Sequence, residues 1–175
     1  PRPAPGRWRP LRLGLLDIYR YEYQEFWFER GRLLLRGNNG TGKSRVLALT
    51  LPFLLDGEVS SHRLEPDGDA AKRIEWNLLL DKYDERLGYT WLELGRMDPV
   101  EGERFLTLGC GLQAIAGKPG LHARWFFITT QRIGKDLFLQ SPLGHALGRE
   151  KLAEFGSEVA SVAFSCSSSF SRSSR

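Results

Sequence analysis

A short glycine-rich stretch carries the residues with the clearest chemical meaning. It matches the phosphate-binding pattern G-x-x-x-x-G-K-[ST] with Gly37, Asn38, Asn39, Gly40, Thr41, Gly42, Lys43 and Ser44. Glycines let the backbone adopt positive φ and bring N–H groups close to phosphate oxygens, which a Cβ atom would obstruct. We expect the Lys43 ammonium to contact the β- and γ-phosphates of ATP, and the Ser44 hydroxyl to coordinate Mg²⁺. The stretch therefore predicts a site for ATP and Mg²⁺.

The residues on either side favour this interpretation over a surface turn rich in Gly and Asn. Residues 33–35 are three leucines and predict a buried strand, and the apolar residues within 46–51 predict a helix. A helix that starts at the loop would add unpaired N–H groups that favour an anion. Pro52 lacks a backbone donor, so we expect the helix to kink or end near residues 48–51, and residues 56–57 to close it.

Length and composition are those of a globular protein with one core. The chain has 175 residues, of which 41% are hydrophobic. It contains no apolar run of the roughly 20 residues that cross a bilayer, so we expect a cytoplasmic protein without a membrane partner. The net charge of +4 permits binding to nucleic acid but does not indicate it. Cys110 and Cys166 lack the spacing of a metal site or a disulfide framework, which predicts free thiols.

Changes in composition divide the chain into three regions. Residues 1–10 are rich in Pro and Arg and predict a flexible N-terminal arm, in which Trp8 is best suited to contact another surface. Residues 11–155 are expected to form the lobe that carries the loop. Residues 156–175 are rich in Ser and predict a disordered tail.

Patterns of apolar residues predict the other elements of the lobe. Alternation at residues 11–15 predicts a half-buried strand, and the aromatic residues 26–28 predict a second one. Aromatic residues in this arrangement can stack on nucleic-acid bases, but packing within a sheet is favoured. Residues 58–73 are polar and predict a loop with at most a short helix, in which His62 is solvated.

The period of the pattern changes after residue 76. Turn residues separate short β-type runs, which predicts an antiparallel meander beside the nucleotide-binding sheet: residues 78–80, 89–94, 104–108, 125–129 and 137–140. Residues 149–155 predict the start of a helix. A meander beside a sheet that binds nucleotide gives a mixed α/β architecture.

The sequence lacks residues that would hydrolyse ATP. Hydrolysis needs an apolar strand ending in Asp, which helps to hold Mg²⁺, and a residue that activates water. The one candidate is Asp81 after three leucines, and it is weak because Asn77 interrupts the apolar run and Lys82 follows. The sequence also has no LSGGQ-like signature motif and no N-K-x-D motif. We therefore assign no catalytic residue, and we expect the isolated chain to bind ATP without hydrolysing it.

The opening RWRPLRLGLLDIYRYEYQEFWFERGRLLLRGNNGTGKS and the meander after the first helix resemble the SMC family of P-loop ATPases, which includes SbcC and MukB. The resemblance covers about residues 7–155. The segment RLLLRGNNGTGKSRVLALTLPFLLDGE, followed by RIEWNLLL, YTWLELGR, FLTLGCGLQAIAG and RWFFIT, is similar to the SMC-like subunit of Wadjet-type plasmid-defence complexes.

The resemblance implies a mixed α/β P-loop NTPase fold, namely the N-terminal half of an ABC/SMC-type head with a mixed sheet and an antiparallel β-meander. It implies that residues 37–44 are the Walker A loop. It also implies three partners: the C-terminal lobe of the same head, a second head in a dimer, and DNA bound through the full complex. The family's coiled coil, Walker B aspartate and signature motif have no counterpart in these 175 residues.

Two other interpretations remain open. The chain could be a self-contained small P-loop nucleotide kinase or NTPase, although the predicted meander stands where such an enzyme needs further parallel strands. It could also be a non-functional truncated remnant or an interaction module, which the Ser-rich end would suit. On either the SMC-like or the remnant interpretation we expect the chain to be a fragment.

Overall fold

The computed structural model describes residues 1–57, 74–155 and 160–162. The predicted loop at residues 58–73, with His62, lies outside the described residues, and so does Cys166. The predicted disordered tail also lies outside them, except at residues 160–162, which pair with a neighbouring strand.

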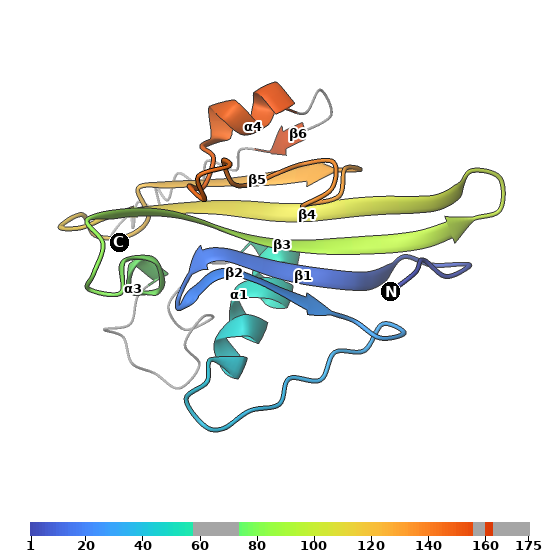
Figure 1. The fold of residues 1–175 in the computed structure, drawn as a ribbon, viewed down its shortest axis with the longest axis horizontal. Helices are drawn as coiled ribbons and strands as arrows, with labels where there is room; N and C mark the ends of the chain where they lie inside the picture. Colours follow the sequence, from blue (N-terminus) through green and yellow to red (C-terminus); the bar gives the residue numbers. More distant parts are fainter. Residues whose placement is uncertain (58–73, 156–159, 163–175) are drawn as a thin grey trace, which may run out of the picture.

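A single six-stranded sheet forms the body of the molecule (Figure 1), with the strands in the order β2-β1-β3-β4-β5-β6. All five pairings between these strands are antiparallel. The strands are β1 (Arg9–Ile18), β2 (Tyr21–Trp27), β3 (Glu85–Asp98), β4 (Gly102–Ile115), β5 (Ala123–Thr129) and β6 (Ala160–Val162). The strands predicted at residues 11–15, 89–94, 104–108 and 125–129 lie within β1, β3, β4 and β5, where β-branched, aromatic and leucine side chains alternate between two buried faces.

Three helices accompany the sheet in the described part of the chain: α1 (Lys43–Asp56), α3 (Ile74–Leu79) and α4 (Arg149–Phe155). Helix α1 begins and ends close to where the sequence places it, and Gly57 follows it with a φ of 69°. Pro52 predicts a kink or an end near residues 48–51, and the helix does not end there but continues to Asp56. The apolar residues Leu51 and Leu54 pack against the core on either side of Pro52, and that packing outweighs the loss of one backbone donor.

The two faces of the sheet are covered by different parts of the chain. Helices α1 and α3 cover one face, where Val46 and Leu49 of α1 pack against Leu13 and Leu15 of β1. The other face is covered by the segment of residues 133–152, which packs on a layer of aromatic side chains. Because both faces are covered, the central strands bury residues on both sides, as β1 does throughout its middle.

The aromatic layer lies directly on glycines of the neighbouring strands. A Cβ atom added to Gly14 would lie 2.2 Å from the ring of Trp91, and one added to Gly111 would lie 2.3 Å from the ring of Trp125. At Gly109 the same atom would lie 2.0 Å from the Phe127 ring. These glycines are therefore required by close packing of rings against the backbone, not by an unusual backbone conformation.

A buried network of charged residues ties the covering segment to this face. The carboxylate of Glu93, which is fully buried, accepts hydrogen bonds from Arg12 at 2.8 Å and from Arg132 at 3.0 and 3.1 Å. Arg12 also donates to Glu25 at 2.9 Å and to the Ile133 carbonyl. The network thus joins β1, β2 and β3 to the segment that covers them.

The predicted fold class is wrong. The sequence and the family resemblance predict a mixed α/β P-loop NTPase with a strand immediately before the loop, and such a fold requires parallel pairing. The named strands pair only antiparallel, and residues 33–35 have no regular secondary structure and do not belong to the sheet. Figure 1 shows the chain between β2 and α1 leaving the edge of the sheet. Leu34 is 72% exposed, whereas Leu33 and Leu35 are partly buried against the core without pairing in the sheet.

Three smaller predictions also differ from the structure. Residues 78–80 were predicted as a strand, but Leu78 lies in α3, where Ile74 and Leu78 are one helical turn apart and bury together. Residues 137–140 take part only in isolated bridges. Strand β2 ends at Trp27 and begins earlier than the aromatic run predicts, because it pairs with β1 along its whole length. Among the described residues, no helix is long and apolar enough to cross a bilayer.

Candidate functional site

The glycine-rich loop lies directly before the first turn of α1. The first hydrogen bond of this helix joins the Val46 N–H to the Gly42 carbonyl, at 3.0 Å. The N–H groups of the residues between them therefore have no acceptor within the helix. These groups and the positive end of the helix dipole favour an anion at the loop.

Two glycines give the loop its shape. Gly40 and Gly42 have φ values of 81° and 89°, in the left-handed region that glycine adopts without strain. A Cβ atom at Gly42 would also lie 3.0 Å from the hydroxyl oxygen of Tyr21 and 3.2 Å from the ring of Tyr19. Gly42 is thus required both by its conformation and by the close approach of the loop to these tyrosines.

The side chain of Lys43 folds onto the loop. Its ammonium group donates to the carbonyl oxygens of Gly37 and Asn38, both at 2.7 Å. The Thr41 hydroxyl donates to the same Asn38 carbonyl at 2.9 Å. The positive charge of Lys43 therefore already lies within the loop. An ammonium group can rotate its three donors, so it can exchange these carbonyls for phosphate oxygens.

The hydroxyl of Ser44 is the group of the loop that the sequence assigns to Mg²⁺. Ser44 is exposed in the first turn of α1, and its hydroxyl makes no hydrogen bond with another described residue. Mg²⁺ usually keeps several waters and takes few protein ligands beside phosphate oxygens, so a single hydroxyl fits the ion. Among residues 1–57, 74–155 and 160–162 there is no group of three or more His, Cys, Asp or Glu that could hold a metal.

An aromatic wall stands beside the loop, formed by Tyr19, Tyr21, Arg45 and Trp76. The ring centroids of Tyr19 and Trp76 are 5.9 Å apart, and those of Tyr19 and Tyr21 are 6.2 Å apart. The Arg45 guanidinium lies 6.0 Å from the Tyr19 ring and 5.8 Å from the Trp76 ring. The Tyr21 hydroxyl donates to the Thr41 carbonyl at 3.3 Å, which joins the wall to the loop.

The environment of the wall changes the pKa values of two of its groups. Burial raises the pKa of the Tyr21 hydroxyl, with a smaller contribution from Tyr19, so this hydroxyl stays protonated at neutral pH. Burial lowers the pKa of Arg45, but a guanidinium stays charged at any pH at which the protein is folded. The wall therefore combines flat apolar rings with one positive charge, next to a loop at which the N–H groups of α1 favour an anion.

Sequence reasoning assigned no role to the wall. Tyr19 comes from the turn between β1 and β2, Tyr21 from the start of β2 and Trp76 from α3, and their contact depends on how the sheet and α3 meet. In the structure Tyr19 and Arg20 are the two residues of a tight hairpin turn, because they separate the paired residues Ile18 and Tyr21.

The weak candidate for a second acidic site does not lie at the end of a strand. Helix α3 ends at Leu79, and Asp81 follows it in a turn with a φ of 53°. A Walker B aspartate requires an apolar strand immediately before it, and the described residues supply a helix there.

No family model and no curated protein matches this chain.

Proposed function

We propose that the loop of residues 37–44 binds the phosphates of Mg²⁺-ATP, and that the chain is the ATP-binding lobe of an SMC-like ATPase that acts on DNA. The observation that carries the proposal is the loop itself. It combines a helix N-terminus, two glycines in the left-handed conformation and a lysine whose ammonium lies within the loop. Each of these features favours a polyphosphate.

The aromatic wall supports ATP over a bare polyphosphate. A purine has a flat π surface, which stacks on aromatic rings and on a guanidinium group. Tyr19 and Trp76 offer such rings beside the loop, and the Tyr21 hydroxyl contacts the loop directly. In this arrangement the loop holds the phosphates, Ser44 contributes one ligand to Mg²⁺, and the wall contacts the base.

Hydrolysis requires a partner in this proposal. No catalytic residue is assigned to this chain, so the C-terminal lobe of the head and a second head would complete the site in the cytoplasm. Leu47 and Leu55 lie on α1 and are exposed, although α1 buries its other face against the sheet. A lobe that docks on α1 would cover these leucines.

A thermal unfolding experiment tests the nucleotide site. At about one hundred times its dissociation constant, Mg²⁺-ATP should stabilise the folded chain by about 2.7 kcal/mol, which raises Tm by roughly 5–11 °C. Lys43→Ala should remove most of this shift. Lys118→Ala, which changes an exposed lysine far from the loop in sequence, should leave it intact.

A comparison of two ligands distinguishes the contribution of the loop to binding from that of the wall. Trp76→Ala should reduce the shift given by Mg²⁺-ATP but not the shift given by Mg²⁺-tripolyphosphate, since only ATP has a base. An ATP shift that survives in the Lys43→Ala variant would contradict the proposal.

A further inference from the structure

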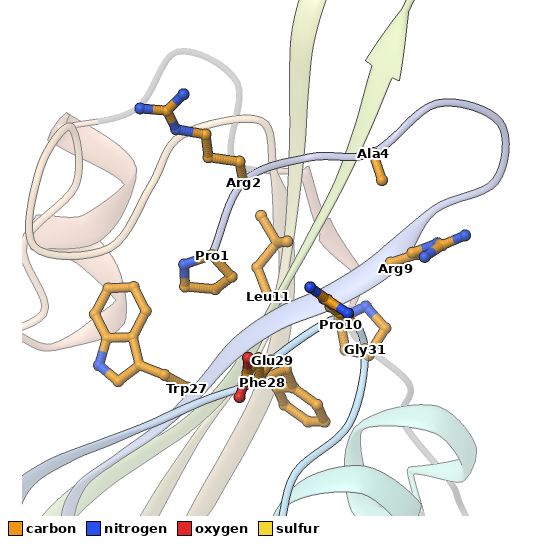
Figure 2. Close-up of a pocket in the computed structure, with 11 residues that line it drawn as sticks. Pro1, Arg2, Ala4, Arg9, Pro10, Leu11, Trp27, Phe28, Glu29 and Gly31 are labelled. Atoms are coloured by element: carbon orange, nitrogen blue, oxygen red, sulfur yellow. The ribbon is translucent and has the colours of Figure 1, made fainter.

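A basic groove with an exposed tryptophan lies at the opposite end of β2 from the aromatic wall. Two adjoining hollows of about 530 and 590 Å³ form it, and they share Trp27, Glu29 and Arg30. Figure 2 shows the first hollow, with Trp27 and Arg9 on opposite sides and Pro1 and Leu11 between them. We call these two hollows the Trp27 groove.

The charged side chains of the Trp27 groove are mostly arginines. Arg2, Arg9, Arg30 and Arg32 line it, and Glu29 is its one carboxylate. Four positive charges and one negative charge give the groove a net charge of +3. None of these arginines pairs through its side chain with another described residue, and the Nε atom of Arg9 is buried without a hydrogen-bond partner. Unpaired guanidinium groups around one hollow favour a ligand with several anionic groups.

Trp27 supplies a flat surface in the middle of the groove. Its side chain is 52% exposed, and the Arg12 guanidinium lies 5.5 Å from its ring centroid. Arg12 itself is buried and held by Glu25 and Glu93, so it fixes the ring from the inside. An indole held in this way, with half of its surface open to solvent, can stack on a planar group.

Arg30 lies in a tight turn after β2 and lines both hollows together with Trp27. The backbone of Glu29 and Arg32 forms two hydrogen bonds of 2.8 and 2.9 Å, and Arg30 and Gly31 between them have φ values of 51° and 77°. A non-glycine residue in the left-handed region is uncommon and often marks a functional position. The turn is short and doubly hydrogen-bonded, so the backbone that carries Arg30 is well defined.

From these observations we infer that the Trp27 groove binds single-stranded nucleic acid, with one base stacked on Trp27 and the adjacent phosphates held by the arginines. Stacking requires an unpaired base, which a duplex does not offer. Guanidinium groups at the rim suit phosphates that are spaced along a backbone. An acidic peptide would satisfy the charges but would leave the open indole surface without a planar partner. This site is separate from the nucleotide loop and does not depend on it.

Fluorescence anisotropy tests the inference, with a labelled twelve-nucleotide oligo(dT), the matching oligo(U) and a duplex of the same length. We expect both single strands to bind at least tenfold more tightly than the duplex. The logarithm of affinity should fall with the logarithm of salt concentration by roughly 0.7 for each phosphate contacted. Binding should be unchanged by Lys43→Ala, which separates this result from the test of the nucleotide site.

Substitutions identify which side chains of the groove bind the single strands. Trp27→Ala should weaken binding of the single strands by about 5- to 100-fold. Trp8→Ala is the matched control, because Trp8 is also exposed but lies outside the groove, where Arg96 stacks on it. Arg30→Asn should reduce the salt slope by about 0.7, since asparagine tolerates the left-handed conformation and removes one phosphate contact.

Removal of the one carboxylate that lines the groove should raise the affinity for single strands, whereas the substitutions above lower it. Glu29→Gln should tighten binding, and because Glu29 is exposed this variant and Arg30→Asn should both stay folded. The inference is wrong if the duplex binds as tightly as the single strands, or if Trp27→Ala and Trp8→Ala behave alike while both are folded. It is also wrong if an oligoglutamate of equal charge displaces the oligonucleotide at equal concentration.

Discussion

The buried carboxylate of Glu93 should be one of the most sensitive positions in the sheet. It accepts three hydrogen bonds from Arg12 and Arg132, and its side chain has no exposed surface. Removal of one member of a buried ion pair usually costs about 3–5 kcal/mol, because the other charge stays buried without compensation. Glu93→Ala should fall near the lower end of this range, about 3 kcal/mol, since Arg12 keeps its bond to Glu25.

A loss of about 3 kcal/mol should lower Tm by roughly 6–12 °C in a domain of this size. Glu101→Ala provides the control, because Glu101 pairs with Arg104 on the surface and its side chain is 57% exposed. Such surface pairs contribute at most about 1 kcal/mol. Hydrogen exchange in the Glu93→Ala variant should increase first in residues 130–152, which Arg132 ties to the sheet. Equal loss of stability in the two variants would refute the reasoning.

Two further predictions concern the core. Gly111→Ala should destabilise the fold by about 1–3 kcal/mol in chemical denaturation, because the new methyl group would overlap the Trp125 ring, whereas Gly148→Ala meets no atom within 4 Å and should be neutral. Burial raises the pKa of the Cys110 thiol well above its ordinary value of 9.0, so the folded state keeps a proton that the unfolded state loses. Stability should therefore fall as the pH rises above about 9, by at most about 1.4 kcal/mol per pH unit from this thiol, and Cys110→Ala should flatten the decline.

The sequence predicted three of the five runs of the meander correctly, at residues 89–94, 104–108 and 125–129, and it predicted the strand before the loop wrongly, for different physical reasons. Residues 89–94 and 104–108 carry their pairing partner nearby in the chain, because a short turn returns the chain antiparallel to itself. The leucines at 33–35 have the apolar character of a buried strand, but apolar character does not specify a pairing partner. Leu33 and Leu35 pack against the core, and the run pairs with no described strand. The three leucines after Asn77 are too few to distinguish the period of a helix from that of a strand. The first two lie in α3, which is stabilised by packing against the sheet.

The candidate site also has one part that the sequence predicts and other parts that it does not. The glycine-rich turn before α1 was predictable because residues 37–44 are contiguous and the helix follows directly, whereas the binding of ATP there stays a prediction. The aromatic wall was not predictable, because Trp76 and Tyr19 are separated by 57 positions in the sequence and meet only in the folded sheet. The Trp27 groove depends equally on tertiary structure, since Arg2 and Arg30 approach it from different segments.

The rings that lie on glycines also constrain how this sequence can change over generations. A side chain at Gly14 would be tolerated only if Trp91 became smaller, and a smaller residue at 91 would leave a void unless position 14 grew at the same time. The same holds for Gly109 with Phe127. Each single substitution is unfavourable, whereas the double substitution is not. In relatives of this chain, the two positions of each pair should therefore vary together. Relatives should differ at both members or at neither.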